Sequence, residues 1–252
     1  MDKRFIVVSG LPASGKSTLA RRLAPALGLP LLDKDEILER LFDLSGNSAR
    51  TGRTAEPDTV AERLDAAGRA VRELSGNSAR PGRTAEPDTV AERLDTGRRA
   101  VRALNGVGDS AWRRALSRQS DSILRTEASA SEGAILVSHW HLPGMNPDSG
   151  TPVGWLAELP GKTVNVHCVC DAEVAAARFI QRRRHPGHRD GERPDSEVLA
   201  SIRAVAMLGQ IDIGPRVFVD TSHEPDIDVV LRQIQDALQA IRRPSPGTRL
   251  HR

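Results

Sequence analysis

Residues 10–17 combine small residues, a lysine and a serine at a fixed spacing. Two glycines stand five positions apart, and Lys16 and Ser17 follow the second, in the order Gly-Leu-Pro-Ala-Ser-Gly-Lys-Ser. In this pattern small residues let backbone N–H groups curl around a β-phosphate, the lysine reaches the β- and γ-phosphate oxygens, and the hydroxyl ligates Mg²⁺. The sequence therefore predicts a nucleotide-binding loop that uses Gly10, Ala13, Ser14, Gly15, Lys16, Ser17 and Thr18.

Two carboxylates follow the next short apolar segment, residues 29–33, which we predict to be a strand. They are Asp33 and Asp35. Open α/β sheets bind ligands beyond the carboxyl ends of their strands, and a carboxylate placed there accepts the proton of an attacking hydroxyl. We predict Asp35 as this general base, with Asp33 as the alternative. The competing interpretation is that one of the two only caps the following helix.

Arginines gather around a later Pro-Gly break. Arg178, Arg182, Arg183 and Arg184 precede the segment His185-Pro-Gly-His188-Arg189. A mobile arginine lid would stabilise the charge of a moving phosphoryl group and exclude water, which predicts Arg182 and Arg184 as catalytic. The competing interpretation is a solvated basic end of a helix.

Apolar runs and helical patterns alternate around these groups. The predicted strands are 4–9, 29–33, 134–137, 163–169 and 216–219. The predicted helices run from 18 to 27, where Gly28 ends the helix, and over 35–44, 111–130, 172–183, 196–208 and 227–241. This alternation is typical of an α/β P-loop fold, a five-stranded parallel sheet covered by helices on both faces.

A tandem repeat interrupts the pattern. Residues 45–74 and 75–104 are identical at 25 of 30 positions, and each has a loop-like half and a half with helical spacing. We predict a mostly helical insertion at 45–104, available to a protein partner, in a kinase domain formed by 1–44 and 105–242. Residues 243–252 are predicted to be a flexible tail.

The composition excludes several classes of protein. The net charge is +3 and aromatic residues make up 3% of the chain, which argues against a nucleic-acid-binding surface built on base stacking. The chain has two cysteines, and its start shows no signal-peptide pattern. We expect a cytoplasmic protein without membrane association.

The motifs resemble the small P-loop kinases grouped as AAA-type ATP-binding proteins, which include zeta-toxin-like, chloramphenicol-phosphotransferase-like and polynucleotide-kinase-like enzymes. The resemblance rests on residues 8–18, 32–35, 169–178 and 219–221. It implies ATP and Mg²⁺ as cofactors, Asp35 as the general base, and Asp220 and Thr221 near the adenine. Ser138 stands where relatives often carry Asp, and Leu38 stands where polynucleotide kinases carry a phosphate-gripping Arg.

We therefore expect an ATP- and Mg²⁺-dependent kinase that phosphorylates a hydroxyl of a small molecule, such as an antibiotic, a sugar or a nucleoside. Two alternatives stay open. One is a nucleotide-dependent switch or interaction protein that hydrolyses ATP slowly. The other is a zeta-toxin-like kinase.

Overall fold

A parallel sheet forms the centre of the protein. The computed structural model describes residues 3–183, except 45–108, together with 185–188 and 193–241. Within them the chain forms one five-stranded sheet of order β2-β3-β1-β4-β5, in which all neighbours are parallel. The strands are β1 (Arg4–Gly10), β2 (Leu31–Asp33), β3 (Gly133–Val137), β4 (Lys162–Val169) and β5 (Arg216–Asp220).

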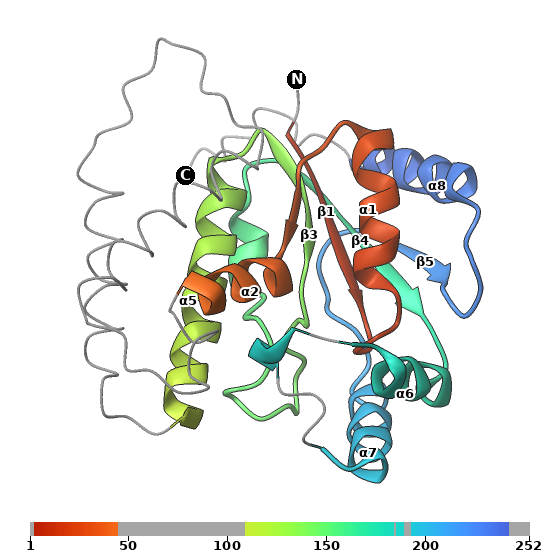
Figure 1. Cartoon of the computed structure of the whole chain (residues 1–252). Helices are drawn as coiled ribbons and strands as arrows, with labels where there is room; N and C mark the ends of the chain where they lie inside the picture. The colour runs from red at the N-terminus through yellow and green to blue at the C-terminus, as the bar shows by residue number, and fades with distance from the viewer. Residues whose placement is uncertain (1–2, 45–108, 184, 189–192, 242–252) are drawn as a thin grey trace, which may run out of the picture.

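Helices cover both faces of this sheet (Figure 1). On one face lie α1 (Lys16–Leu27) and α8 (Ile227–Ala240), and on the other lie α2 (Lys34–Leu44) and α5 (Asp109–Ala130). Beyond the carboxyl ends of the strands, α6 (Ala172–Gln181) packs on α7 (Asp195–Ala206). Two 3₁₀ turns, η2 (Gly154–Glu158) and η3 (Pro186–His188), complete the described elements. None of the described helices is long and apolar enough to cross a membrane.

The central strand explains the two-faced architecture. Alternate side chains of β1 point to opposite sides, so Phe5 and Val7 join the apolar cluster under α2 and α5, while Ile6 and Val8 join the cluster under α1 and α8. All four side chains are fully buried. A strand that is apolar on both faces requires helices on both faces, as in other parallel sheets. The predicted fold class is confirmed.

Several predicted boundaries differ by one or two residues, among them the end of the helix predicted over 196–208, which lies at Ala206. Two of these differences have local reasons. We expected the second strand to begin at residue 29, but the Leu29 N–H bonds to the Ala24 carbonyl at the end of α1, and β2 begins at Leu31. The helix predicted over 172–183 ends at Gln181, because Arg182 has an extended backbone with φ −73° and ψ 136°. The predicted end of α1 is confirmed, since Gly28 takes a left-handed conformation with φ 63°.

The predicted repeat insertion and the predicted tail lie outside the described residues. The elements that flank the insertion, α2 and α5, pack against each other, and Leu41, Phe42 and Leu116 belong to one apolar cluster. Residues on both sides of the repeats in the sequence therefore contribute to one core on this side of the sheet.

We predict that deleting residues 45–104 leaves a folded protein that binds Mg-ATP. Each repeat carries few large apolar residues, and the entropy lost on ordering such a segment exceeds what those residues can recover by burial. Circular dichroism, thermal melting and calorimetric titration with nucleotide would check this. An insoluble variant, or one without nucleotide affinity, would show that the repeats belong to the core.

Candidate active site

The loop between β1 and α1 has the backbone geometry of a tight cradle. Gly10 has φ 138°, and a Cβ built there would lie 2.7 Å from the Cys168 carbonyl oxygen and 2.8 Å from Ser14 Oγ. Ala13 has φ 59° and Gly15 has φ 89°, so the chain turns through left-handed conformations before α1 begins. Small residues are required at these positions because larger ones are strained there.

Polar groups converge inside this cradle. The Lys16 Nζ donates to the carbonyl oxygens of Gly10 (3.2 Å) and Leu11 (2.7 Å). The Ser14 hydroxyl is completely buried and has no hydrogen-bond partner among the described residues. Burial lowers the pKa of Lys16, whereas the nearby Asp35 and Asp33 raise it. A buried hydroxyl with no partner, an ammonium and a helix N-terminus fit a phosphate group.

Asp33 lies against the first turn of α1. It is 3% exposed and accepts a hydrogen bond from the Ser17 side chain and another from the Asp35 backbone N–H at 3.0 Å. Burial raises its pKa from the ordinary 3.8 to about 6, although the bond from Ser17 opposes the shift. The capping interpretation therefore applies to Asp33, at the start of α2. A hydroxyl and a carboxylate in contact also fit Mg²⁺, which prefers oxygen ligands.

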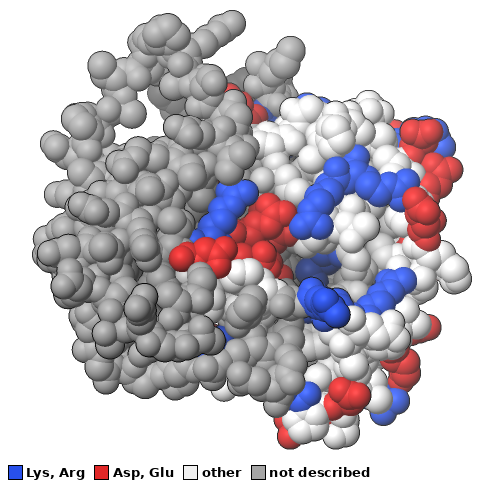
Figure 2. Space-filling view, in the orientation of Figure 1, with Lys and Arg blue, Asp and Glu red and all other residues white. Residues whose placement is uncertain are grey.

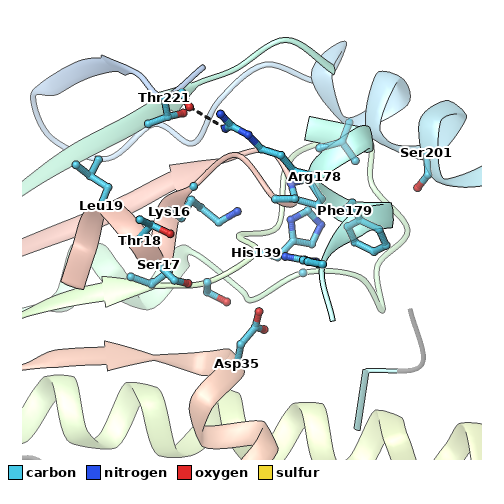
Figure 3. Close-up of a pocket in the computed structure, with 18 of the residues that line it drawn as sticks. Lys16, Ser17, Thr18, Leu19, Asp35, His139, Arg178, Phe179, Ser201 and Thr221 are labelled. Carbon is cyan, nitrogen blue, oxygen red and sulfur yellow. Dashed lines mark hydrogen bonds between the residues drawn. The ribbon is translucent and has the colours of Figure 1, made fainter. Parts of the chain in front are cut away.

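Asp35 points from the first turn of α2 into the space in front of Lys16 and Ser17 (Figure 3). Both carboxylates line the cavity. Asp33 also bonds to Ser17 in the first turn of α1, whereas Asp35 points toward Lys16 and Ser17 from the first turn of α2. Sequence spacing alone did not separate them.

A cavity of about 1070 Å³ opens in front of these groups. Figure 2 shows a hollow in this face of the molecule, with Lys and Arg side chains gathered around it and acidic side chains beside them. One end is formed by Arg22 and residues 221–225. Further lining residues come from the loop after β3 and from α7 and the turn that follows it, namely Ser138, His139, Gly144, Met145, Asn146, Ser149, Gly150, Ser201, Ala204, Val205 and Leu208. The volume lies close to the upper end of the range of about 300–1,000 Å³ that is typical of small-molecule sites.

The residues after β5 divide between the cavity and the surface. Thr221 lines the cavity, and its hydroxyl donates to the Val169 carbonyl at 3.0 Å. The Asp220 side chain accepts the Ser222 N–H at 2.8 Å and is exposed, and Asp220 is not among the lining residues. The structure therefore brings Thr221, but not Asp220, to the predicted site.

Arg178 holds this same loop by its backbone. Its guanidinium donates to the carbonyl oxygens of Thr221 and Ser222, both at 2.7 Å (Figure 3). A planar fork of donors suits two adjacent carbonyls. The sequence grouped Arg178 with the predicted lid, whereas the structure ties it to the loop after β5.

The described part of the predicted lid contacts α2. Arg182 lines the cavity, with its guanidinium 4.4 Å from the centre of the Phe179 ring. His185 and His188 lie 3.0 Å from the carboxylates of Asp43 and Glu39. Arg184 lies outside the described residues.

Two cavity residues could not be found from the sequence. Arg22 and Ser201 reach the cavity from α1 and α7. Neither belongs to a local motif, so only the packing of the helices and strands reveals them.

Comparisons with known proteins identify the family of this chain. A family model described as an AAA domain matches residues 5–208. This chain belongs to the AAA-domain family. The AAA-domain chain is 42% identical over 72 residues to the shikimate kinase of Corynebacterium glutamicum, a match that covers 25% of the chain and 41% of that enzyme. It is 52% identical over 48 residues to the shikimate kinase of Mycobacterium tuberculosis, covering 19% and 22%.

The chain spans less than half the length of these curated relatives. Among solved structures, the shikimate kinase from Bacteroides thetaiotaomicron aligns over 95% of the AAA-domain chain and 99% of its own, with 16% identity and a TM-score of 0.45. The resemblance to AAA-type P-loop proteins stated from the sequence is confirmed at the level of the family.

We predict that Asp33→Asn raises the free energy of unfolding of the nucleotide-free protein at neutral pH. Because folding raises the pKa of Asp33 to about 6, the folded state favours the neutral carboxyl. The stabilisation it gives is present in acid and is lost as the pH rises through about 6. One pKa unit corresponds to about 1.4 kcal/mol, so the variant should gain about 1–3 kcal/mol near pH 7.5 and little near pH 4.

Urea denaturation at the two pH values, without Mg²⁺ or nucleotide, measures this difference. Asp236→Asn, at an exposed position on α8, is the matched control. An equal effect of Asp33→Asn at both pH values would contradict the prediction.

Proposed function

We propose that this AAA-domain protein is an ATP- and Mg²⁺-dependent kinase that phosphorylates a hydroxyl of a small molecule, such as an antibiotic, a sugar or a nucleoside. The observation that carries the proposal is the position of Asp35. Its carboxylate shares one cavity with Lys16 and Ser17, and residues of the loop after β3 and of α7 line the same cavity. The curated relatives it matches are named shikimate kinases, which supports a small-molecule acceptor.

The cradle residues bind the nucleotide in this proposal. The backbone N–H groups of residues 13–18 and the Lys16 ammonium hold phosphate oxygens, which releases Lys16 from its bonds to the Gly10 and Leu11 carbonyls. Ser17 and Asp33 hold Mg²⁺, and the bound ion neutralises charge on the transferred phosphoryl group. Thr221, in the loop held by Arg178, borders the base of the nucleotide.

Asp35 acts as the general base. A hydroxyl that enters from the β3–α7 side of the cavity meets Asp35 before it reaches the phosphates. The carboxylate accepts the hydroxyl proton as the oxygen attacks phosphorus, and Arg182 stabilises the charge on the equatorial oxygens. Arg184 is proposed for the same task.

The direct test is mass spectrometry after incubating the protein with Mg-ATP and a panel of hydroxyl compounds. We expect one acceptor to gain the mass of a phosphoryl group while ADP forms in equal amount. ADP formed slowly with no phosphorylated product would instead favour a nucleotide-dependent switch.

Asp35→Asn is expected to lower kcat by about 10²–10⁴ while the affinity for Mg-ATP stays the same, because the proton moves only in the transition state. Steady-state kinetics with the identified acceptor measures this. Glu36→Gln is the matched control, since Glu36 follows directly in α2 and pairs with Arg21 at 2.9 Å outside the cavity. If Glu36→Gln lost as much activity as Asp35→Asn, the effect would be structural.

Lys16→Ala is expected to weaken ADP binding by at least about tenfold, because hydrogen bonds from a charged donor contribute about 1.5–3 kcal/mol. Calorimetric titration provides the measurement. Lys162→Ala, at the opposite end of the sheet, should bind ADP like the unchanged protein. Unchanged affinity in a folded Lys16→Ala protein would refute the assignment of the loop.

A further inference from the structure

Four polar side chains form a continuous chain from α2 to the end of β3. The Lys34 ammonium lies 2.6 Å from Asp121 Oδ1, and the Thr151 hydroxyl donates to the same oxygen at 2.7 Å. Thr151 Oγ1 lies 2.5 Å from Ser138 Oγ. Lys34, Thr151 and Ser138 are 8%, 0% and 3% exposed. We call these four residues the polar chain.

The backbone fixes the meeting point of Thr151 and Ser138. The Thr151 N–H donates to the His139 carbonyl at 2.7 Å, and the Thr151 carbonyl accepts the His141 N–H at 2.8 Å. Gly150 makes this approach possible, because it has φ 78° and a Cβ there would lie 2.8 Å from the His141 backbone. Thr151 is therefore held beside Ser138 by main-chain bonds that do not depend on its hydroxyl.

The ion pair decides the direction of each hydrogen bond in the polar chain. A carboxylate facing an ammonium accepts hydrogen bonds and donates none, so the single hydroxyl proton of Thr151 points to Asp121. Thr151 Oγ1 can then only accept in its bond with Ser138. The Ser138 proton is committed to Thr151, and only lone pairs remain for other partners.

Ser138 lines the cavity of the candidate active site, at the end of β3. The preceding residue, Val137, pairs with Asp33 in the β2–β3 register. A serine ordinarily both donates and accepts hydrogen bonds. Here the polar chain leaves the neutral Ser138 hydroxyl able only to accept hydrogen bonds from other groups, as a carboxylate does. The sequence has no acidic residue at this position.

We propose that Ser138 binds an O–H donor in the cavity, and that Lys34, Asp121 and Thr151 are positioning residues that make it a pure acceptor. This inference rests on the proposed function, in which the reacting hydroxyl gives its only proton to Asp35. The donor is therefore another O–H group. It is either a water carried by Mg²⁺, whose protons point away from the metal, or a second hydroxyl of the acceptor molecule.

The decisive pair of variants is Thr151→Val and Thr151→Ser. The first removes the hydroxyl with little change of shape, and the second keeps it. We expect Thr151→Val to free the Ser138 proton and to weaken the O–H donor contact about threefold to tenfold, the range for one neutral hydrogen bond. Thr151→Ser should retain the behaviour of the unchanged protein.

Two measurements distinguish the sources of the donor. Calorimetric titration with ADP, with and without Mg²⁺, tests the metal-bound water, and Thr151→Val should then lose part of the gain in affinity that Mg²⁺ provides. Kinetics with the identified acceptor test the second hydroxyl, and Thr151→Val should then raise KM for the acceptor with less change in kcat. Ser138→Ala should repeat whichever effect is found, and it covers the case in which Thr151→Val fails to fold.

Neutron diffraction of the unchanged protein tests the hydrogen-bond direction without any activity. A deuterium on Ser138 that lies between Ser138 and Thr151 is expected, and one that points into the cavity would overturn the inference. Equal behaviour of Ser138→Ala and the unchanged protein in both binding measurements would also overturn it. If no acceptor is phosphorylated, the proposed function fails, and the titration with Mg²⁺ and ADP then decides the role of Ser138 alone.

Discussion

The close approach of Gly10 to the Cys168 carbonyl is the constraint on which the site depends. β1 and β4 stay paired to their carboxyl ends, and Gly10 is the partner of Cys168 in that register. A side chain at Gly10 would collide with the β4 backbone, so the chain can leave the sheet only through a tight left-handed turn. That turn directs the N-terminus of α1 and the Lys16 side chain into the space where β2 and β3 also end. The spacing between the backbones of β1 and β4 thus positions the side chains of the candidate site.

The same convergence places charged groups in a poorly solvated region. Asp33 is buried where the cradle meets β2, and the structure keeps a carboxylate there although burial disfavours its charge. Such a group reduces stability in the absence of ligands, and carboxylates with strongly shifted pKa values cluster at functional sites. The apolar clusters on the two faces of the sheet supply the stability that this arrangement requires.

Local patterns predicted the parts of the protein that local forces determine. The phosphate loop, the end of α1 at Gly28 and the two-faced β1 all follow from short-range rules on glycine, capping and apolar runs. The separate orientations of Asp33 and Asp35 did not, because they depend on how α1 packs against the start of α2. The polar chain could not be predicted from the sequence either. Its members Lys34, Asp121 and Ser138 are brought together only by the packing of α2, α5 and β3. Long-range pairing of this kind leaves no periodicity in a sequence.

Arg178 holds the loop after β5 through main-chain atoms, so these contacts do not depend on which side chains the loop carries. The guanidinium contacts this loop through the carbonyl oxygens of Thr221 and Ser222, groups that every amino acid possesses. Substitutions at positions 222–225 therefore leave the hold on the loop intact while they change the surface offered to a ligand. Diversity at these positions leaves the Arg178 contacts unchanged, so the surface that this loop offers to a ligand can diverge among related chains without disturbing the loop between β1 and α1.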